Sequence, residues 1–229
     1  MSDTNSGVTT LPLPQAVIFD LDGTLFQTET LLETVHRRVF ETLREEGLYL
    51  APLPPIDMLL GSLGMVLSDI WKKVMPEGST EAHERANVLL LQYEMEELAV
   101  GRGHLYPGVI ETLRELRGRG IRLFIASNGL EEYVKGVPAI KGIGDWFEGT
   151  YSAGEFATKT KVDLVRRLLD TYEVDQAWMV GDRSSDVEAG KSNGLSVVGC
   201  NYAGFCRRGE LDGSDAIIGS FPELLKLLP

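Results

Sequence analysis

Short runs of hydrophobic residues alternate along this chain with segments in which hydrophobic residues recur every three or four positions. Each run ends in polar or turn-forming residues, which is typical of strands buried on both faces of a parallel sheet. The runs are Ala16–Phe19, Arg122–Ala126, Gly149–Tyr151, Ala177–Val180, Leu195–Gly199 and Ala216–Ile218. The pattern therefore predicts six strands.

The segments between these strands have the spacing of amphipathic helices. Val109–Arg119 and Val162–Thr171 each place their hydrophobic residues on one helical face, and Arg183–Asn193 leads to Gly194, a residue type that often ends a helix. Strands that alternate with helices predict an α/β fold, in which helices cover both faces of a parallel sheet.

One interval departs from this alternation. Between Thr30 and His104 no convincing strand occurs, and the spacing is helical in Thr30–Glu46, Ile56–Val74 and Thr80–Val100. Because the interval directly follows the first strand and its turn, we expect a helical insert that lies over that turn like a lid.

These patterns divide the chain into three parts. The α/β core is expected in residues 14–29 and 105–229, and an all-helical cap in residues 30–104. Residues 1–13 are small and polar and lack the basic and hydrophobic segments of a signal peptide. We therefore expect them to form a disordered N-terminal tail.

Charge and composition exclude several classes of partner. The 34 acidic residues outnumber the 22 basic ones, and the formal net charge of −12 disfavours nucleic-acid binding. No stretch approaches the length of apolar sequence that spans a membrane. Only two cysteines occur, which favours a reducing compartment, so we expect a cytoplasmic protein. We also expect it to be a monomer or a homodimer.

Polar side chains that suit phosphoryl chemistry follow several of the predicted strands. In open parallel sheets, ligands bind beyond the carboxyl ends of the strands, so these residues are expected to meet at one edge. They are Asp20 and Asp22, then Ser127 and Asn128, then Asp182 and Asp186, with Lys159 and Lys161 near the start of a predicted helix.

Each residue type has a chemical role at such a site. Asp20 and Asp182 can each offer a carboxylate oxygen to Mg²⁺, which prefers oxygen ligands. Asp20 can attack phosphorus to form an aspartyl-phosphate, and Asp22 can protonate the leaving oxygen and then deprotonate the attacking water. Ser127 and Asn128 can donate hydrogen bonds to phosphoryl oxygens, and a lysine adds positive charge.

The motifs of this set resemble those of the haloacid dehalogenase-like hydrolase superfamily. They are Asp20-Leu21-Asp22-Gly23-Thr24-Leu25, Ser127-Asn128 and Gly181-Asp182-Arg183-Ser184-Ser185-Asp186, with the lysine motif between the last two. Tyr106-Pro107-Gly108-Val109 also resembles the segment that leads back from a small helical cap in the phosphoglycolate-phosphatase-like branch. The resemblance covers Ala16 to about Leu211.

This resemblance implies a Rossmann-like core, a magnesium-dependent phosphohydrolase activity and a mobile helical cap. It also implies that the backbone carbonyl of Asp22 reaches the metal, so the expected metal ligands are Asp20, Asp22 and Asp182. For Asp186 two roles are open, and we favour capping or orienting its neighbours over direct metal binding.

Two lysines compete for the phosphate-binding role. Many relatives carry Lys-Pro-x-Pro, which would align Lys159, although both prolines are replaced here by Thr160 and Val162. Other relatives carry a lysine followed by x-Asp and two hydrophobic residues, which matches Lys161-Val162-Asp163-Leu164-Val165. We favour Lys161.

The leading functional prediction is a phosphatase that acts on a small phosphorylated metabolite, with phosphoglycolate as one candidate. A β-phosphoglucomutase-like phosphomutase is the alternative, because its core motifs would look the same. A phosphonate hydrolase with a Schiff-base lysine, Lys72 or Lys73, and a non-catalytic binding protein are less favoured. Substrate selection is expected from the cap, whose basic residues are Arg37, Arg38, Arg44, Lys72, Lys73, Arg85 and Arg102.

Overall fold

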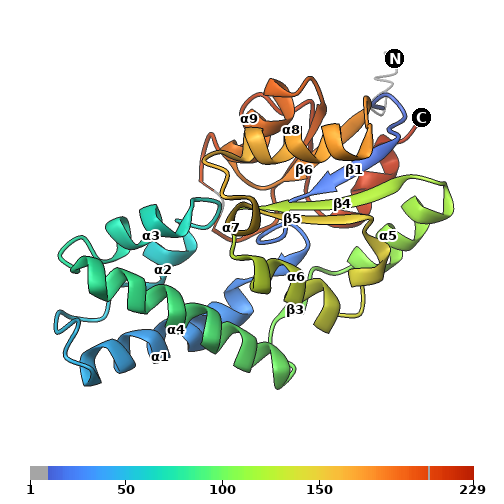
Figure 1. Ribbon diagram of the computed structural model, residues 1–229. Coiled ribbons are helices and arrows are strands. Elements are labelled where there is room, and N and C mark those ends of the chain that lie inside the picture. The colour runs from blue at the N-terminus through green and yellow to red at the C-terminus, as the bar shows by residue number, and fades with distance from the viewer. Residues whose placement is uncertain (1–9, 206) are drawn as a thin grey trace, which may run out of the picture.

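A computed structural model describes residues 10–205 and 207–229 and contains a six-stranded parallel sheet (Figure 1). The strand order is β5-β4-β1-β6-β7-β8, so β1 lies in the middle of the sheet. The strands are β1 (Ala16–Phe19), β4 (Arg122–Ser127), β5 (Gly149–Ser152), β6 (Ala177–Gly181), β7 (Ser196–Cys200) and β8 (Ala216–Ile218). All six predicted strands are present, with their ends shifted by at most one residue.

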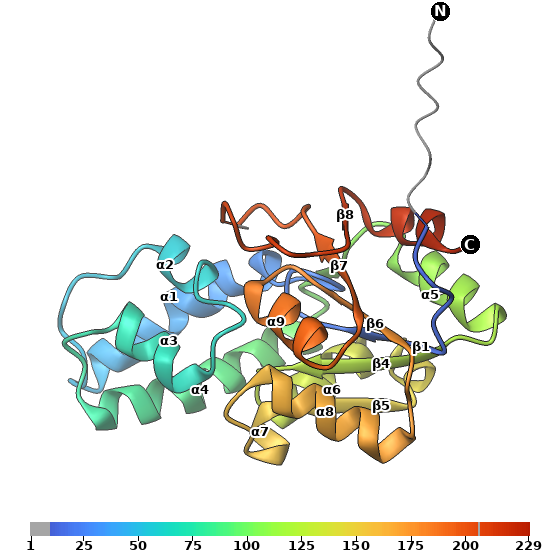
Figure 2. The same cartoon turned by 90° about the horizontal axis from the view of Figure 1, so that it is seen from above.

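Helices cover both faces of the sheet. Figures 1 and 2 show α8 (Lys161–Tyr172) and α9 (Ser184–Ser192) on one face, and α5 (Val109–Gly118) and α6 (Glu131–Ile140) on the other. The 3₁₀ segment η2 (Phe221–Leu227) packs beside α5, while η1 (Gly144–Trp146) and α7 (Ala153–Phe156) flank β5.

The alternation of side chains along β1 divides the core into two layers. Val17 and Phe19 pack in the layer with α5, α6 and η2, whereas Ala16 and Ile18 pack in the layer with α8 and α9. This follows from the two-residue period of a strand and explains why the β1 segment is hydrophobic at every position. The predicted α/β fold is confirmed.

Four helices form the cap: α1 (Glu29–Glu45), α2 (Ile56–Leu60), α3 (Leu67–Val74) and α4 (Thr80–Ala99). Helices α1 and α4 pack on each other, and α4 also packs on α6 of the core. The prediction of one helix over Ile56–Val74 was wrong, because residues 61–66 form an irregular cap loop between α2 and α3. Gly64 in this loop has φ +88°, a left-handed conformation that interrupts a helix.

The chain enters and leaves the cap through two paired strands. β2 (Phe26–Gln27) and β3 (His104–Leu105) are antiparallel, with Phe26 opposite Leu105 and Gln27 opposite His104. The two crossings therefore form one stem between core and cap.

The packed part of the core begins before residue 14. The amide of Leu11 donates to the carbonyl of Leu227 at 2.8 Å, and the indole of Trp178 donates to the carbonyl of Pro12 at 2.9 Å. Of the N-terminal tail expected over residues 1–13, residues 1–9 lie outside the described residues, and the stretch from Leu11 onward contacts the core. Within the described ranges, no helix is both long enough and apolar enough to cross a membrane.

Candidate active site

Three of the predicted site residues follow adjacent central strands. Phe19 of β1 lies opposite Ile125 of β4 and Val180 of β6, so the chain leaves all three strands at the same edge. Asp20, Ser127 and Asp182 stand at that edge, and all three are buried. The backbone amide of Asp20 donates to the carbonyl of Val180 at 2.9 Å, which fixes the nucleophile candidate to its neighbouring strand.

Lys161 joins two carboxylates of this edge. Its Nζ lies 2.5 Å from Oδ1 of Asp20 and 2.5 Å from Oδ1 of Asp186, and the side chain is buried, with 3% exposed. Lys161 reaches the site because it is the first residue of α8, after the N-cap Thr160, whose hydroxyl accepts from the amide of Asp163. Lys159 is exposed and lines a neighbouring groove instead.

The buried charges shift one another's pKa values. Burial raises the pKa of Asp20, against the opposing effect of Lys161, and burial raises the pKa of Asp182 well above its usual value with help from Asp20. Burial also raises the pKa of Asp186, to about 6. Burial alone would lower the pKa of Lys161, but the carboxylates of Asp186 and Asp20 outweigh it and raise the value.

The acidic residues of this edge fit a divalent cation. One carboxylate oxygen from each of Asp20, Asp182 and Asp186 lies within 4.8 Å of the others, and all three residues are buried. Gly23 has φ +78°, and a Cβ there would lie 2.5 Å from Oδ2 of Asp182, so the carboxylate occupies the space that a side chain would take. Clustered hard oxygen donors at this spacing suit Mg²⁺.

Asp186 is held by its own helix as well as by Lys161. Its Oδ2 accepts from the backbone amide of Arg183 at 3.0 Å, which caps the N-terminus of α9. Both oxygens of Asp186 therefore have a partner in the protein, Oδ1 in Lys161 and Oδ2 in the amide of Arg183.

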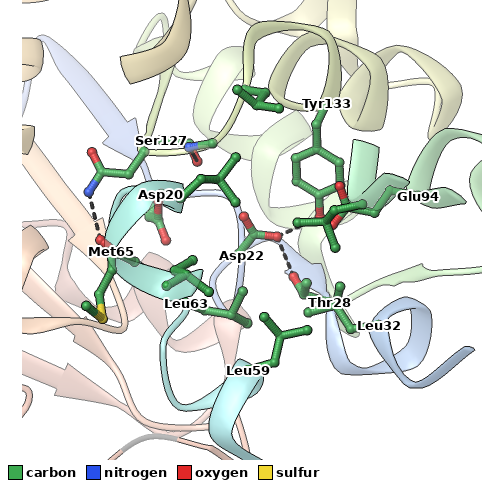
Figure 3. Close-up of a pocket in the computed structure, with 17 residues that line it drawn as sticks. Asp20, Asp22, Thr28, Leu32, Leu59, Leu63, Met65, Glu94, Ser127 and Tyr133 are labelled. Atoms are coloured by element: carbon green, nitrogen blue, oxygen red, sulfur yellow. Dashed lines mark hydrogen bonds between the residues drawn. The ribbon is translucent and has the colours of Figure 1, made fainter. Parts of the chain in front are cut away.

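Asp22 is oriented by two hydroxyl groups. Its Oδ1 accepts a hydrogen bond from Thr28 at 2.5 Å and another from Tyr133 at 2.7 Å (Figure 3). Burial raises the pKa of Asp22, and these two hydrogen bonds lower it in part. Thr28 and Tyr133 were not among the predicted site residues; Tyr133 comes from α6, a helix that the hydrophobic pattern did not predict.

Two core side chains hold the cap close to the sheet edge. Asn128 donates through Nδ2 to the carbonyl of Gly64 at 2.7 Å, and Arg183 donates through Nη2 to the carbonyl of Leu60 at 3.0 Å. Asn128, predicted to bind phosphate, therefore contacts the cap loop with its amide nitrogen, whereas Ser127 is buried and accepts from the amide of Gly129 at 3.3 Å.

The model of one protein family, described as haloacid dehalogenase-like hydrolase, matches residues 14–194. This chain belongs to the haloacid dehalogenase-like hydrolase family. Both the predicted resemblance and the predicted phosphohydrolase are confirmed by this match and by the relatives that accompany it.

Relatives of this hydrolase carry different names. A phosphoglycolate phosphatase of Rhodospirillum rubrum is 31% identical over 83% of this chain and 80% of its own length. The tyrosine-protein kinase PtkA of Mycobacterium tuberculosis is 29% identical over 82% of this chain and 63% of its own length. A solved structure of a predicted phosphoglycolate phosphatase from Haemophilus somnus has a TM-score of 0.78 at 21% identity, covering 93% of this chain and 97% of that one, and shows the shared fold.

The hydrolase encloses a small cavity of about 60 Å³ between the core and the cap (Figure 3). The core wall includes Asp20, Asp22, Ser127 and Asn128 from the strand ends and loops, and Tyr133 from α6. The cap wall consists of Leu32, Leu59, Leu63, Gly64, Met65, Leu67, Ile70, Leu90 and Glu94. The cavity therefore lies between the polar edge of the core and a largely aliphatic cap wall.

Proposed function

We propose that this hydrolase is a magnesium-dependent phosphatase that cleaves a small phosphorylated metabolite through an aspartyl-phosphate on Asp20. The observation that carries the proposal is the position of Asp20. This buried carboxylate is held at the sheet edge by Lys161, lies in an acidic cluster of cation-binding spacing, and faces the same cavity as Asp22.

In the first step, the carboxylate of Asp20 would attack the phosphorus atom of the substrate. The bond from phosphorus to the substrate oxygen breaks, and that oxygen leaves as an alcohol after it takes a proton from Asp22. Asp22 then takes a proton from water, whose oxygen attacks phosphorus, and inorganic phosphate leaves while the Asp20 carboxylate is restored. Both hydrogen bonds from Thr28 and Tyr133 go to Oδ1 of Asp22, so we assign the proton transfer to Oδ2.

The positive charge near the phosphoryl group would come from Lys161 and from a bound cation. Asp20 and Asp182 would hold Mg²⁺ through their carboxylates and Asp22 through its backbone carbonyl, while Asp186 keeps Lys161 in place. When bound there, Mg²⁺ supplies charge neutralisation for an anionic phosphate that approaches a carboxylate nucleophile.

The phosphate oxygens would also need hydrogen-bond donors from the sheet edge. Ser127 and Asn128 line the cavity and are assigned this role, with the amide nitrogen of Asn128 shared between phosphate and the cap loop.

The alternative functions differ in what the cap contributes. A phosphonate hydrolase requires a lysine in the cavity, but Lys72 pairs with Asp69 at 2.9 Å and Lys73 donates to the carbonyl of Gly61 at 3.2 Å, and neither is among the described residues that line the cavity. A phosphomutase would use the same core residues, and only the fate of the phosphoryl group separates it from a phosphatase.

The test is phosphate release by the purified full-length chain. The protein is stripped with EDTA and assayed with and without added Mg²⁺ on p-nitrophenyl phosphate and on a panel of phosphorylated metabolites that includes phosphoglycolate and glucose 1-phosphate. We expect phosphate release that depends on Mg²⁺, and an adduct of beryllium fluoride on Asp20 detected by fluorine NMR. Full activity in excess EDTA, or an adduct on another residue, would contradict the mechanism, and sugar isomerisation without phosphate release would establish the mutase.

A further inference from the structure

Glu94 is a buried acid that the proposed chemistry does not use. It lies on α4, is 7% exposed, and faces the cavity beside Tyr133 and across from Asp22 (Figure 3). Of the described residues that the cap contributes to the cavity wall, Glu94 alone has an ionisable side chain, and the others are aliphatic side chains, Met65 and Gly64.

The helix that carries Glu94 offers a direct comparison. Glu97 lies one turn further along α4 and is equally buried, but it forms ion pairs with Arg38 at 2.8 Å and Arg102 at 3.0 Å. No ion pair of Glu94 occurs among the described residues, and burial, followed by the charge of Asp22, raises its pKa well above the usual value. A buried acid without a cation destabilises a fold, so a carboxyl in this position at a cavity wall points to a ligand.

Among its described lining residues, the cavity offers no basic side chain to a second anionic group. Neither lysine nor arginine is found among the described residues that line it, and Lys161 is engaged by Asp20 and Asp186. None of the seven basic cap residues named from the sequence is among the described residues that line the cavity. Their partners are Glu41 for Arg37, Glu96 and Glu97 for Arg38, Ala51 for Arg44, Asp69 for Lys72, Gly61 for Lys73, Glu46 for Arg85, and Thr34 and Glu97 for Arg102.

Resting on the proposed phosphatase function, we infer that Glu94 selects phosphate monoesters whose alcohol part carries no negative charge and presents a hydroxyl or ammonium group to the Glu94 carboxyl. With the phosphoryl group at Asp20, the alcohol part extends toward the cap, where the Glu94 carboxyl is the one polar side chain among the described residues of the cap wall. A hydroxyl or ammonium there gains a hydrogen bond. A carboxylate, such as that of phosphoglycolate, can bind there only if the Glu94 carboxyl keeps its proton, because two ionised carboxylates in one buried space repel each other.

Three phosphate monoesters of equal length test this inference. Phosphoglycolate, 2-hydroxyethyl phosphate and phosphoethanolamine end in a carboxylate, a hydroxyl and an ammonium, respectively. We expect the wild type to prefer one of the last two over phosphoglycolate by at least about tenfold in kcat/KM, since like charges in a buried site are strongly disfavoured. The preferred one of the two identifies the group that Glu94 binds.

Variants of α4 then assign the preference to Glu94. Glu94→Gln should reduce the discrimination against phosphoglycolate by about tenfold, and Glu94→Asp, which keeps the charge, should retain the ranking. Glu96→Gln is the matched control, because Glu96 lies two residues away on the exposed side of α4 and pairs with Arg38. Circular dichroism confirms that each variant is folded.

The outcomes separate this inference from the function on which it rests. If the wild type hydrolyses p-nitrophenyl phosphate and prefers phosphoglycolate, or if Glu94→Gln leaves the ranking unchanged, the inference is wrong and the phosphatase stands. If none of the three compounds is hydrolysed, their inhibition constants against p-nitrophenyl phosphate must follow the same ranking, and equal inhibition overturns the inference. Failure to hydrolyse p-nitrophenyl phosphate as well would overturn the phosphatase itself.

Discussion

The two walls of the cavity are built on different principles. On the core side, polar groups are fixed by ion pairs and hydrogen bonds. Lys161 forms ion pairs with Asp20 and Asp186, and two hydroxyl groups donate hydrogen bonds to Asp22. The cap wall is aliphatic apart from Glu94. A reaction needs groups fixed to within a fraction of an ångström, which a sheet edge provides, whereas selection needs a surface whose residues can change without disturbing the reacting groups. The comparison assigns the chemistry to the core and the choice of substrate to the cap.

The largest expected effect comes from the core wall. Asp20→Asn removes the nucleophile while it keeps the size of the side chain, and we expect turnover of any substrate to fall by at least ~10³. Phosphate release at saturating p-nitrophenyl phosphate measures it. A variant with near wild-type turnover would show that the covalent step does not run through Asp20.

Asp22→Asn should separate two kinds of substrate. An alkyl phosphate needs its leaving oxygen protonated, so its turnover should fall by roughly 10²–10⁴. The leaving group of p-nitrophenyl phosphate needs no proton, so this variant should release a rapid burst of p-nitrophenol and then hydrolyse the aspartyl-phosphate slowly. Stopped-flow absorbance detects the burst, and equal losses for both substrates without a burst would contradict the acid–base role.

Removal of the hydrogen bond between the core wall and the cap wall should have a smaller effect on activity. Asn128→Ala removes the hydrogen bond to Gly64 in the cap loop, and we expect kcat/KM to fall by about tenfold, consistent with the loss of one or two hydrogen bonds. Hydrogen exchange of residues 61–66 should rise while that of the sheet stays constant. Asn201→Ala, an exposed residue of the core, is the control. A raised KM with unchanged exchange would mean that Asn128 serves phosphate alone.

The smallest effect concerns stability on the cap wall. The pKa of Glu94 is raised in the folded protein, so its ionisation opposes folding as the pH rises above the unfolded value of about 4.3. Glu94→Gln should therefore raise Tm at pH 8 by roughly 2–6 °C, and this gain should become small at pH 4, where the carboxyl is mostly protonated in both states. Calorimetry at the two pH values measures it, and a pH-independent shift would exclude the charge as its cause.

The core wall was predictable because its signals are local. The end of a strand, a tight turn and two carboxylates lie within seven residues from Phe19 to Leu25, and parallel strands bring Asp182 to the same edge. Lys161 could be favoured over Lys159 from its motif, and in the structure it is Lys161 that reaches Asp20. These inferences need the order of the strands and little else.

The contacts that depend on how helices pack could not be predicted in the same way. Tyr133 meets Asp22 across 111 positions of sequence, and that contact depends on how α6 packs. Glu94, Glu96 and Glu97 are neighbours on one helix, and only the packing of α1 and α4 decides which of them is paired, exposed or turned to the cavity. The break at Gly64 likewise depends on contacts with Asn128 and Arg183 from distant elements.

The paired strands β2 and β3 have a consequence for how such an enzyme can diversify. Since Gln27 lies opposite His104, the whole segment between these two residues is joined to the core as the loop of a single hairpin would be. The entropy of closing a loop grows only slowly with its length, so this segment can be exchanged for a longer, shorter or differently folded one without moving the register of any central strand. A lineage with this architecture can therefore acquire new substrates by replacing one contiguous stretch of its gene, while the reacting carboxylates are inherited intact.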